Sequence, residues 1–258
     1  MIARGPRELK ALYDRLGPGD IYVGTITTGA LQRSVMIDLM ERGVRVVPSC
    51  LSQSLSRSKT TQAFVFDRWT PPMTRVVGRR IDLLESINVY NGERIGKVVT
   101  KVDHKHCGHG VRLWENIENL YSILGLEDSA YPFVLQPFIS DFVDVRVIVA
   151  GDYKEAYTRE NPFNFRCNLA AGGHSKPYEL NGDQVEFCEL LMKRGKFPYA
   201  HIDLMIMENG TPYLSEISLN GGMKGSAIDQ KALDGIKKTV LEKIAGNIDK
   251  GQGRKQYE

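Results

Sequence analysis

The sequence contains few cysteines, and their spacing excludes the classes of site that depend on clustered thiols. Cys50, Cys107, Cys167 and Cys188 lie far apart, and no CxxC pair occurs among them. A zinc ribbon requires closely spaced cysteine pairs, and a chain of 258 residues does not need disulfides to fold. We therefore expect a protein of a reducing compartment that has no cysteine-based metal site.

Long apolar runs and an excess of one charge are also absent. No apolar run approaches the ~18 residues that span a bilayer, and the polar N-terminus does not resemble a signal peptide. The 34 lysines and arginines are nearly balanced by 31 aspartates and glutamates, and no long basic block occurs. The chain should therefore bind neither nucleic acid nor membrane, and its ordinary composition predicts a globular cytoplasmic protein.

The first 72 residues predict a small α/β unit. Strands are expected over 21–26 and 44–48, and apolar residues at helical spacing predict a helix over 30–42 between them. Such a βαβ unit has parallel strands and a right-handed crossover. The stretch before it is predicted to be a polar helical start, and the Pro71-Pro72 pair marks the end of the unit.

Beyond this boundary, strands outnumber helices and do not alternate strictly with them. Gly151-Asp152 and Asn209-Gly210 are turn signals between apolar segments, and each predicts a hairpin. A final helix is expected over 227–244. The mixed order of elements predicts an α+β domain fused to the small α/β one.

Two carboxylates stand on the two arms of the last predicted hairpin. Asp203 lies in HIDLMIM and Glu216 lies in YLSEIS. Side chains on neighbouring antiparallel strands can face the same side, so these two can converge on one site. Mg²⁺ prefers oxygen ligands and usually takes one or two carboxylates together with phosphates and water. The alternative is that both carboxylates are ordinary edge charges facing solvent.

A lysine followed by a glycine-containing loop forms a second candidate. Lys101 lies near the end of a predicted strand over 97–102 and precedes HKHCGHG. Gly108 and Gly110 would let the backbone approach phosphate oxygens, for which Lys101 supplies a positive charge. The three histidines of this loop have no carboxylate or thiolate partner in the pattern, so we favour a solvated loop over a zinc site.

The stretch FRCNLAAGG places Arg166 and Asn168 on either side of Cys167. Positions i and i+2 of a strand share a face, so a guanidinium and an amide would be presented together. Arginine binds phosphates through two parallel hydrogen bonds, and asparagine can complete a metal shell. The alternative is an exposed strand edge. Cys167 is disfavoured as a nucleophile because no histidine stands at a persuasive position near it in the sequence.

Six segments follow one another in an order that resembles the ATP-grasp enzymes. They are SRSKTTQ, VVTKVDHKHCGHGV, VLQPFISDFVDVRVIVAGD, FRCNLAAGG, HIDLMIM and LSEISLNGGMKG. The branch typified by RimK, which adds glutamate to the C-terminus of a ribosomal protein, is the most similar, over about residues 56–226. The resemblance implies an α+β ATP-grasp fold, with two subdomains over 73–135 and 136–258 that grip ATP. A short, Rossmann-like α/β domain over 1–72 would precede them.

The resemblance also implies roles for single residues. Lys59 and Lys101 match the two lysines that reach the α- and β-phosphates, and the loop over 103–110 matches the mobile flap over the triphosphate. Lys101 and Arg166 are the expected catalytic residues, and Arg166 would stabilise charge on the transferred phosphoryl group. The adenine-binding hinge of the family is matched by Gln136, Pro137 and Phe138, and the acid near the ribose is matched by Asp144. The R-x-N segment is matched by Arg166, Cys167 and Asn168.

Asp203 and Glu216 match the ligands of Mg²⁺, for which Mn²⁺ is an alternative. The usual last motif of the family is E-x-N, but this chain has Ser218 at the asparagine position and Asn220 two residues later. Either Ser218 holds the second metal through water, or a local bulge brings Asn220 in. A second departure is the short N-terminal domain with two predicted strands, which suggests a partner subunit and favours a homodimer.

The activity implied by the resemblance is that of a carboxylate–amine (or thiol) ligase. A carboxylate attacks the γ-phosphate of ATP, and the amine or thiol then displaces phosphate from the acylphosphate. The expected substrates are small-molecule or peptide carboxylates and amines. Two alternatives stay open, a kinase that phosphorylates a hydroxyl on a small molecule and a nucleotide-binding protein that has lost catalysis. Candidates for the acceptor pocket are Tyr157, Arg159, Asn161, Asn164, His174 and Lys176.

Overall fold

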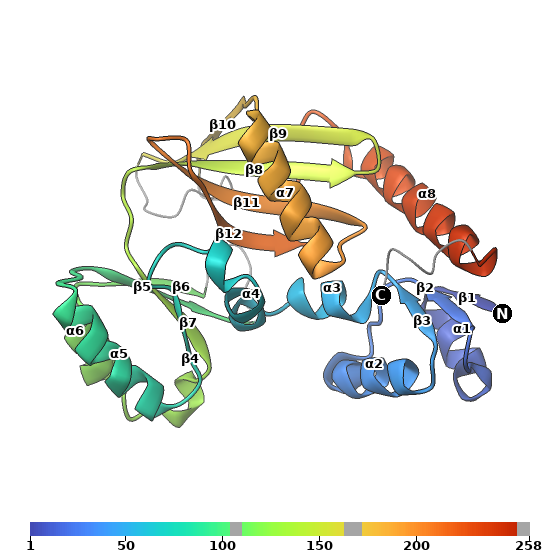
Figure 1. The fold of residues 1–258 in the computed structure, drawn as a ribbon, viewed down its shortest axis with the longest axis horizontal. Helices are drawn as coiled ribbons and strands as arrows, with labels where there is room; N and C mark the ends of the chain where they lie inside the picture. The colour runs from blue at the N-terminus through green and yellow to red at the C-terminus, as the bar shows by residue number, and fades with distance from the viewer. Residues whose placement is uncertain (104–109, 163–171, 252–258) are drawn as a thin grey trace.

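The computed structural model describes residues 1–103, 110–162 and 172–251, which form three β-sheets flanked by helices (Figure 1). The strands are β1 (Ile2–Arg4), β2 (Ile21–Val23), β3 (Arg45–Val47), β4 (Arg75–Val77), β5 (Val98–Val102), β6 (Val111–Trp114), β7 (Phe133–Pro137), β8 (Phe142–Ala150), β9 (Tyr153–Glu160), β10 (His174–Pro177), β11 (Tyr199–Met207) and β12 (Pro212–Ser218). The α-helices are α1 (Gly5–Leu12), α2 (Gln32–Glu41), α3 (Cys50–Leu55), α4 (Lys59–Val65), α5 (Arg80–Gly92), α6 (Ile117–Leu124), α7 (Gly182–Gly195) and α8 (Gln230–Asp249).

The N-terminal sheet consists of β1, β2 and β3, all parallel. The predicted parallel pair on either side of a helix is confirmed. The prediction of only two strands was wrong, because β1 occupies the first residues and pairs with β2. A strand of three residues is too short to show alternation, and this is why the stretch was read as a helical start. The helix α1 begins only at Gly5.

The second sheet has the antiparallel order β4-β7-β5-β6. Apolar side chains of α5 and α6 pack against it, among them the buried Leu83, Tyr90 and Leu120. We call this sheet with α5 and α6 the small lobe. Its strands β5 and β7 lead into two of the predicted nucleotide-binding segments.

The third sheet has the antiparallel order β10-β9-β8-β11-β12 and contributes the largest apolar core. Figure 1 shows α7 lying across one face of this sheet, and we call the two together the large lobe. Both predicted hairpins are confirmed, β8–β9 and β11–β12. Their turns place Gly151 and Gly210 at φ values of 60° and 84°, a region that favours glycine.

Two helical segments join these parts. α4 contacts β12 of the large lobe as well as β4, β5 and β7 of the small lobe, so it lies where the two lobes meet. Leu55 of α3 and Phe66, just after α4, are buried in the core of the large lobe. At the other end of the chain, Ala245 of α8 packs against the N-terminal sheet.

The predicted α+β class with a preceding α/β unit is confirmed by these three sheets. The division at residues 72 and 135 stays a prediction. Among the described residues, no helix is both long and apolar enough to cross a bilayer.

Candidate functional site

A β-bulge directs Glu216 to the same face of the large sheet as Asp203. Asp203 pairs with Glu216, whereas Leu204 pairs with Leu214, so Ser215 is an extra residue on β12. Regular alternation would put Glu216 on the face of Leu214, which is buried in the core. The bulge changes this alternation, as extra strand residues do. The predicted convergence of the two carboxylates is therefore confirmed, while their role as metal ligands stays a prediction.

Two arginines, one on the neighbouring strand β8 and one on β9 beyond it, hold Asp203. Arg146 of β8 stands opposite Asp203, and its Nε and Nη2 donate to Oδ1 at 2.7 Å and to Oδ2 at 2.8 Å. Arg159 Nη2 lies 3.0 Å from Asp203 Oδ2 and 2.6 Å from Asp144 Oδ1. Arg146 was not predicted from the sequence, although its position two residues after Asp144 places both on one strand face.

The pKa values of Asp144 and Asp203 in this network are shifted in opposite directions. Burial acts to raise the pKa of Asp203, but Arg146 and Arg159 outweigh it and hold that pKa well below its usual range. Burial raises the pKa of Asp144 to about 6, because the opposing effect of Arg159 is smaller and the charge of Asp203 adds to the rise. Asp203 is therefore the carboxylate that stays ionised over the wider pH range.

The oxygen donors of Asp203 and Glu216 suit Mg²⁺, but Glu216 is the more accessible of the two. From the described residues, Oδ2 of Asp203 accepts two N–H groups and Oδ1 accepts one, and these contacts leave a single lone-pair direction for a cation. The side chain of Glu216 is 36% exposed and is the more accessible ligand. No group of three His, Cys, Asp or Glu side chains able to hold a metal occurs in the described ranges. An ion would thus complete its shell with substrate oxygens and water.

Lys59 and Lys101 approach the end of β12 from α4 and β5. Lys59 Nζ lies 3.5 Å from Glu216 Oε1. Lys101 Nζ makes long contacts with Ser215, 3.4 Å to Oγ and 3.5 Å to the carbonyl oxygen. Burial lowers the pKa of Lys101, and the carboxylate of Glu216 opposes that shift. The two lysines that the sequence singled out for phosphates therefore stand beside the predicted metal ligand.

Asp103 fixes the two lysines relative to each other. Its Oδ1 accepts the backbone N–H of Thr60 at 3.0 Å, and its Oδ2 accepts the hydroxyls of Ser58 and Thr60 at 2.7 and 2.6 Å. These bonds outweigh burial and lower the pKa of Asp103. Because Asp103 follows β5, it joins the strand of Lys101 to the helix start that carries Lys59.

Gln62 of α4 closes the outer edge of β12 beside the site. Its Oε1 accepts the N–H of Ile217, and its Nε2 donates to the carbonyl of Ile217, both at 2.9 Å. Ser56 Oγ accepts the N–H of Leu219 at 2.9 Å. Side chains thus replace the hydrogen bonds that a further strand would provide, and they hold β12 directly after Glu216.

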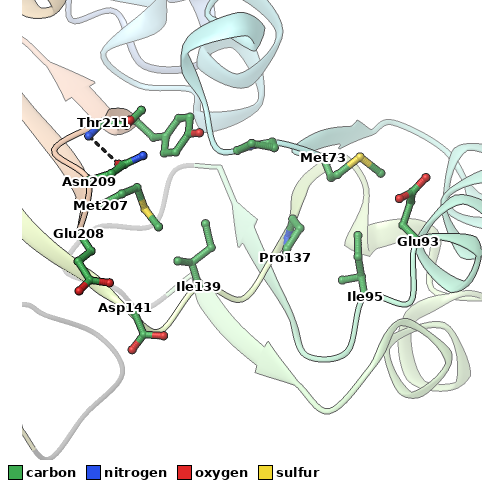
Figure 2. A pocket seen from close by; sticks show the side chains of 12 residues that line it. Met73, Glu93, Ile95, Pro137, Ile139, Asp141, Met207, Glu208, Asn209 and Thr211 are labelled. Atoms are coloured by element: carbon green, nitrogen blue, oxygen red, sulfur yellow. Dashed lines mark hydrogen bonds between the residues drawn. The ribbon is translucent and has the colours of Figure 1, made fainter. Parts of the chain in front are cut away.

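Gln136 and Pro137 at the end of β7 line different cavities. Gln136 is buried and, with Lys59, Lys101 and Ser215, lines a cavity of about 20 Å³, enough for one water molecule. Pro137 lines a larger cavity of about 770 Å³ between the lobes. Figure 2 shows Pro137 and Ile139 between the turn after β11 and the side chains from the small-lobe side. The larger cavity is lined by Pro72, Met73, Glu93, Ile95, Pro137, Ile139, Asp141, Met207, Glu208, Asn209, Thr211 and Tyr213.

The backbone N–H of Phe138 donates to the carbonyl of Lys97 at 2.9 Å. A contact of adenine with this N–H would therefore require that bond to open. Adenine contact by the hinge over 136–138 stays a prediction.

The strand pairing around Glu216 bears on whether Ser218 or Asn220 lies beside that carboxylate. The bulge lies at Ser215, before Glu216, and Ser218 then pairs regularly with His201. The bulge therefore lies before Glu216 and not between Glu216 and Asn220, and the choice between Ser218 and Asn220 stays a prediction. The hydroxyl of Ser218 donates to the carbonyl of Asn220 at 2.5 Å, and Ser218 shares a strand face with Glu216 because residues 216–218 pair regularly with β11.

The predicted acceptor-pocket residues that the structure describes lie on β9, just after β9, and on β10. Tyr157 of β9 stands opposite Arg146 and is buried, and its hydroxyl has no hydrogen-bond partner within the described ranges. Arg159 belongs to the network around Asp203. His174 and Lys176 lie on the edge strand β10 and are exposed. Asn161 follows β9. The segments that carry Asn164, Arg166, Cys167, Asn168 and the glycine-rich loop over 104–109 lie outside the described residues, so these predictions stay as they are.

The chain is similar to several known proteins. Residues 56–244 match the RimK-like ATP-grasp domain. Glutathione synthetase of Parasynechococcus marenigrum (strain WH8102) is 32% identical over 166 residues, 60% of this chain and 51% of that protein, so the chain spans about half of its length.

Two solved structures share the fold. D-alanine–D-alanine ligase from Bacillus anthracis complexed with ATP has a TM-score of 0.60 at 16% identity, with 96% of this chain and 85% of that chain covered. A Chryseobacterium gregarium RiPP-associated ATP-grasp ligase in complex with ADP, and a leader and core peptide, has a TM-score of 0.58 at 17% identity, with 83% and 68% covered. Because the matched domain takes up most of the sequence, this chain belongs to the RimK-like ATP-grasp family.

Proposed function

We propose that this chain is an ATP-dependent carboxylate–amine (or thiol) ligase that forms an acylphosphate and uses Mg²⁺, with Mn²⁺ as a substitute. The observation that supports this most is the meeting of Lys59 and Lys101 with Glu216 and Asp203 at the end of β12. Cations that hold phosphates, set beside carboxylates that hold a metal, are the two parts of a nucleoside triphosphate site.

The residues around β12 position and neutralise the triphosphate. Lys59 would turn from Glu216 to the phosphate oxygens, a short movement because its Nζ already lies 3.5 Å from that carboxylate. Lys101 would contact the phosphates from β5. Bound Mg²⁺ neutralises charge on the phosphoryl oxygens during transfer. Arg166 and Asn168 are proposed to join them at the γ-phosphate.

The carboxylate and amine substrates are proposed to be small molecules or peptides. The similar proteins include a D-alanine–D-alanine ligase and a peptide-bound ligase, which supports both sizes of substrate. Tyr157 and Arg159 are proposed as acceptor-site residues, supported by the contact of Arg159 with Asp203 and by the position of Tyr157 opposite Arg146. We further propose a cytoplasmic location, where ATP is available, and a homodimer.

The test is ADP release from Mg-ATP with a panel of amino acids and short peptides, followed by mass analysis of the product. Lys101→Ala and Glu216→Ala should each lower turnover at least 100-fold, since each removes charge stabilisation at the phosphates. Glu186→Ala, an exposed carboxylate on α7, is the matched control and should leave turnover unchanged. Substantial turnover in either site variant contradicts the proposal, and a stable phosphorylated product would indicate a kinase instead.

A further inference from the structure

A lysine on the last helix is buried beside the metal-site strand. Lys237 of α8 is 6% exposed. Its Nζ donates to the carbonyl of Leu219 at 2.9 Å and to Oδ1 of Asn220 at 3.1 Å, and it lies 3.3 Å from Nε2 of His201. An ammonium group has three N–H donors and no acceptor, so these three acceptors satisfy it fully. Lys237 therefore holds the segment that follows Ser218.

The same segment is held from the opposite end by Arg146. While its other nitrogens bind Asp203, Arg146 Nη1 donates to the carbonyl of Gly222 at 3.0 Å. Two cationic side chains from different elements thus bind residues 219–222, which we call the 219–222 loop. The loop is fixed to β8 through Arg146 and to α8 through Lys237.

His201 of β11 forms the floor under this loop. Its Nε2 accepts from Lys237, so the ring proton is on Nδ1, which is buried and has no hydrogen-bond partner among the residues that the structure describes. A Cβ atom added at Gly221 would lie only 2.8 Å from that Nδ1. Only glycine fits so close to the ring, and the loop therefore has one well-defined path over His201.

This path separates the roles of Ser218 and Asn220. Asn220 uses its side-chain oxygen to accept from the Lys237 ammonium, and a metal cation on the same oxygen would be repelled at short range. Ser218 remains on the face of Glu216, because its backbone is still paired regularly with β11.

We propose that Lys237 is a positioning residue that holds the Asn220 side chain within the 219–222 loop. The Ser218 hydroxyl is then the oxygen beside Glu216 at the metal site. Lys237 itself contacts neither metal nor substrate. This inference rests on the proposed function, since it assigns the use of the same site. It explains how a chain without the asparagine of E-x-N keeps a defined geometry after Glu216.

The experiment measures two affinities for each variant, Mn²⁺ binding in the presence of ADP by electron paramagnetic resonance, and ADP binding without metal by calorimetry. Lys237→Met should weaken Mn²⁺ binding about tenfold or more, the usual effect of losing a residue that orients a metal ligand, and should leave metal-free ADP binding within twofold. Lys238→Met, the exposed neighbour on α8, is the matched control and should match the wild type in both.

Two further variants decide the outcome even where Lys237→Met fails to fold. Asn220→Asp keeps an acceptor for Lys237 and should leave Mn²⁺ binding within twofold, whereas Ser218→Ala should weaken it about tenfold. A large change with Asn220→Asp, or none with Ser218→Ala, would overturn the inference.

The failure of this inference is distinguishable from that of the proposed function. A folded Lys237→Met variant with wild-type Mn²⁺ affinity overturns the positioning role alone. A wild-type protein that binds neither ADP nor Mn²⁺ in the presence of ADP overturns both.

Discussion

The charged side chains around Asp203 contact one another, and removing one of them leaves its partner buried with part of its charge uncompensated. Arg146→Met is the most direct case, because Arg146 makes two of the three hydrogen bonds that described residues donate to Asp203. We expect the free energy of unfolding to fall by about 3 kcal/mol at pH 7, the usual cost of breaking a buried ion pair. Urea unfolding measures it.

The loss in Arg146→Met should shrink at low pH, since protonated Asp203 no longer needs the guanidinium. Lys154→Met, which breaks the exposed pair with Glu189, is the control and should change stability by less than about 1 kcal/mol. A loss of that small size in Arg146→Met would contradict the account of the network.

His201 should make the protein less stable in mild acid. Burial and the neighbouring Lys237 lower the pKa of His201 to about 3, below the value of about 6.5 expected in the unfolded chain. The unfolded state therefore binds a proton first, and stability present above pH 6.5 is lost as the pH falls toward 3. Between pH 7 and 5 the loss from this residue is about 2 kcal/mol.

The comparison with His201→Gln isolates this effect. Glutamine keeps an acceptor for Lys237 but does not titrate, so the variant should lose about 2 kcal/mol less than the wild type between pH 7 and 5. The raised pKa of Asp144 adds stability as the pH falls, but it does so equally in the wild type and in the variant. Equal losses in chemical unfolding at the two pH values would show that His201 does not contribute.

At the scale of elements, the position of β12 depends on α4 as much as on β11. Gln62→Leu removes both hydrogen bonds to Ile217 and leaves its buried N–H and carbonyl unpaired. We expect a loss of about 2–4 kcal/mol in unfolding free energy, the cost of orphaning two buried polar groups. Phe64→Ala on the same helix, where Phe64 is 78% exposed, serves as control. If both variants lose similar amounts, the edge contact is not what holds β12.

The sequence predicts the elements of the site better than its fine geometry. Asn209-Gly210 indicated the hairpin that carries Asp203 and Glu216 on its two arms, because turn chemistry is local, but regular alternation alone would put the two carboxylates on opposite faces. The bulge at Ser215 has no such signal, since it depends on which face of β12 meets the core. Arg146 was missed for a related reason, because its partner Asp203 is 57 residues away.

The contacts of Lys237 had no local signal either. Its place on α8 fits an ordinary amphipathic helix, and only tertiary packing brings it to residues 219–222 and His201. The three-residue strand β1 lay below the length at which alternation can be recognised. The order of six motifs, in contrast, was sufficient to predict the family correctly.

At the scale of the whole molecule, α8 links the large lobe to the N-terminal sheet. Lys237 faces the candidate site, and two turns later Ala245 is fully buried against Ile21 and Val47. Ala245→Glu would place an unpaired charge in this apolar contact and should lower unfolding free energy by about 3 kcal/mol or more. Thermal unfolding with Asn247→Glu, an exposed position on the same helix, provides the check. Equal melting temperatures in the two variants would mean that α8 does not join these parts.

The central claim is that the chain activates a carboxylate with ATP. The most direct measurement supplies Mg-ATP with amino acids and short peptides whose carboxylates carry ¹⁸O, and analyses the released phosphate by mass spectrometry. Attack of a carboxylate on the γ-phosphate transfers one of its oxygens, so the account predicts ADP together with phosphate that carries one ¹⁸O and an amide product. ADP formed with unlabelled phosphate, or a stable phosphorylated substrate, would contradict it.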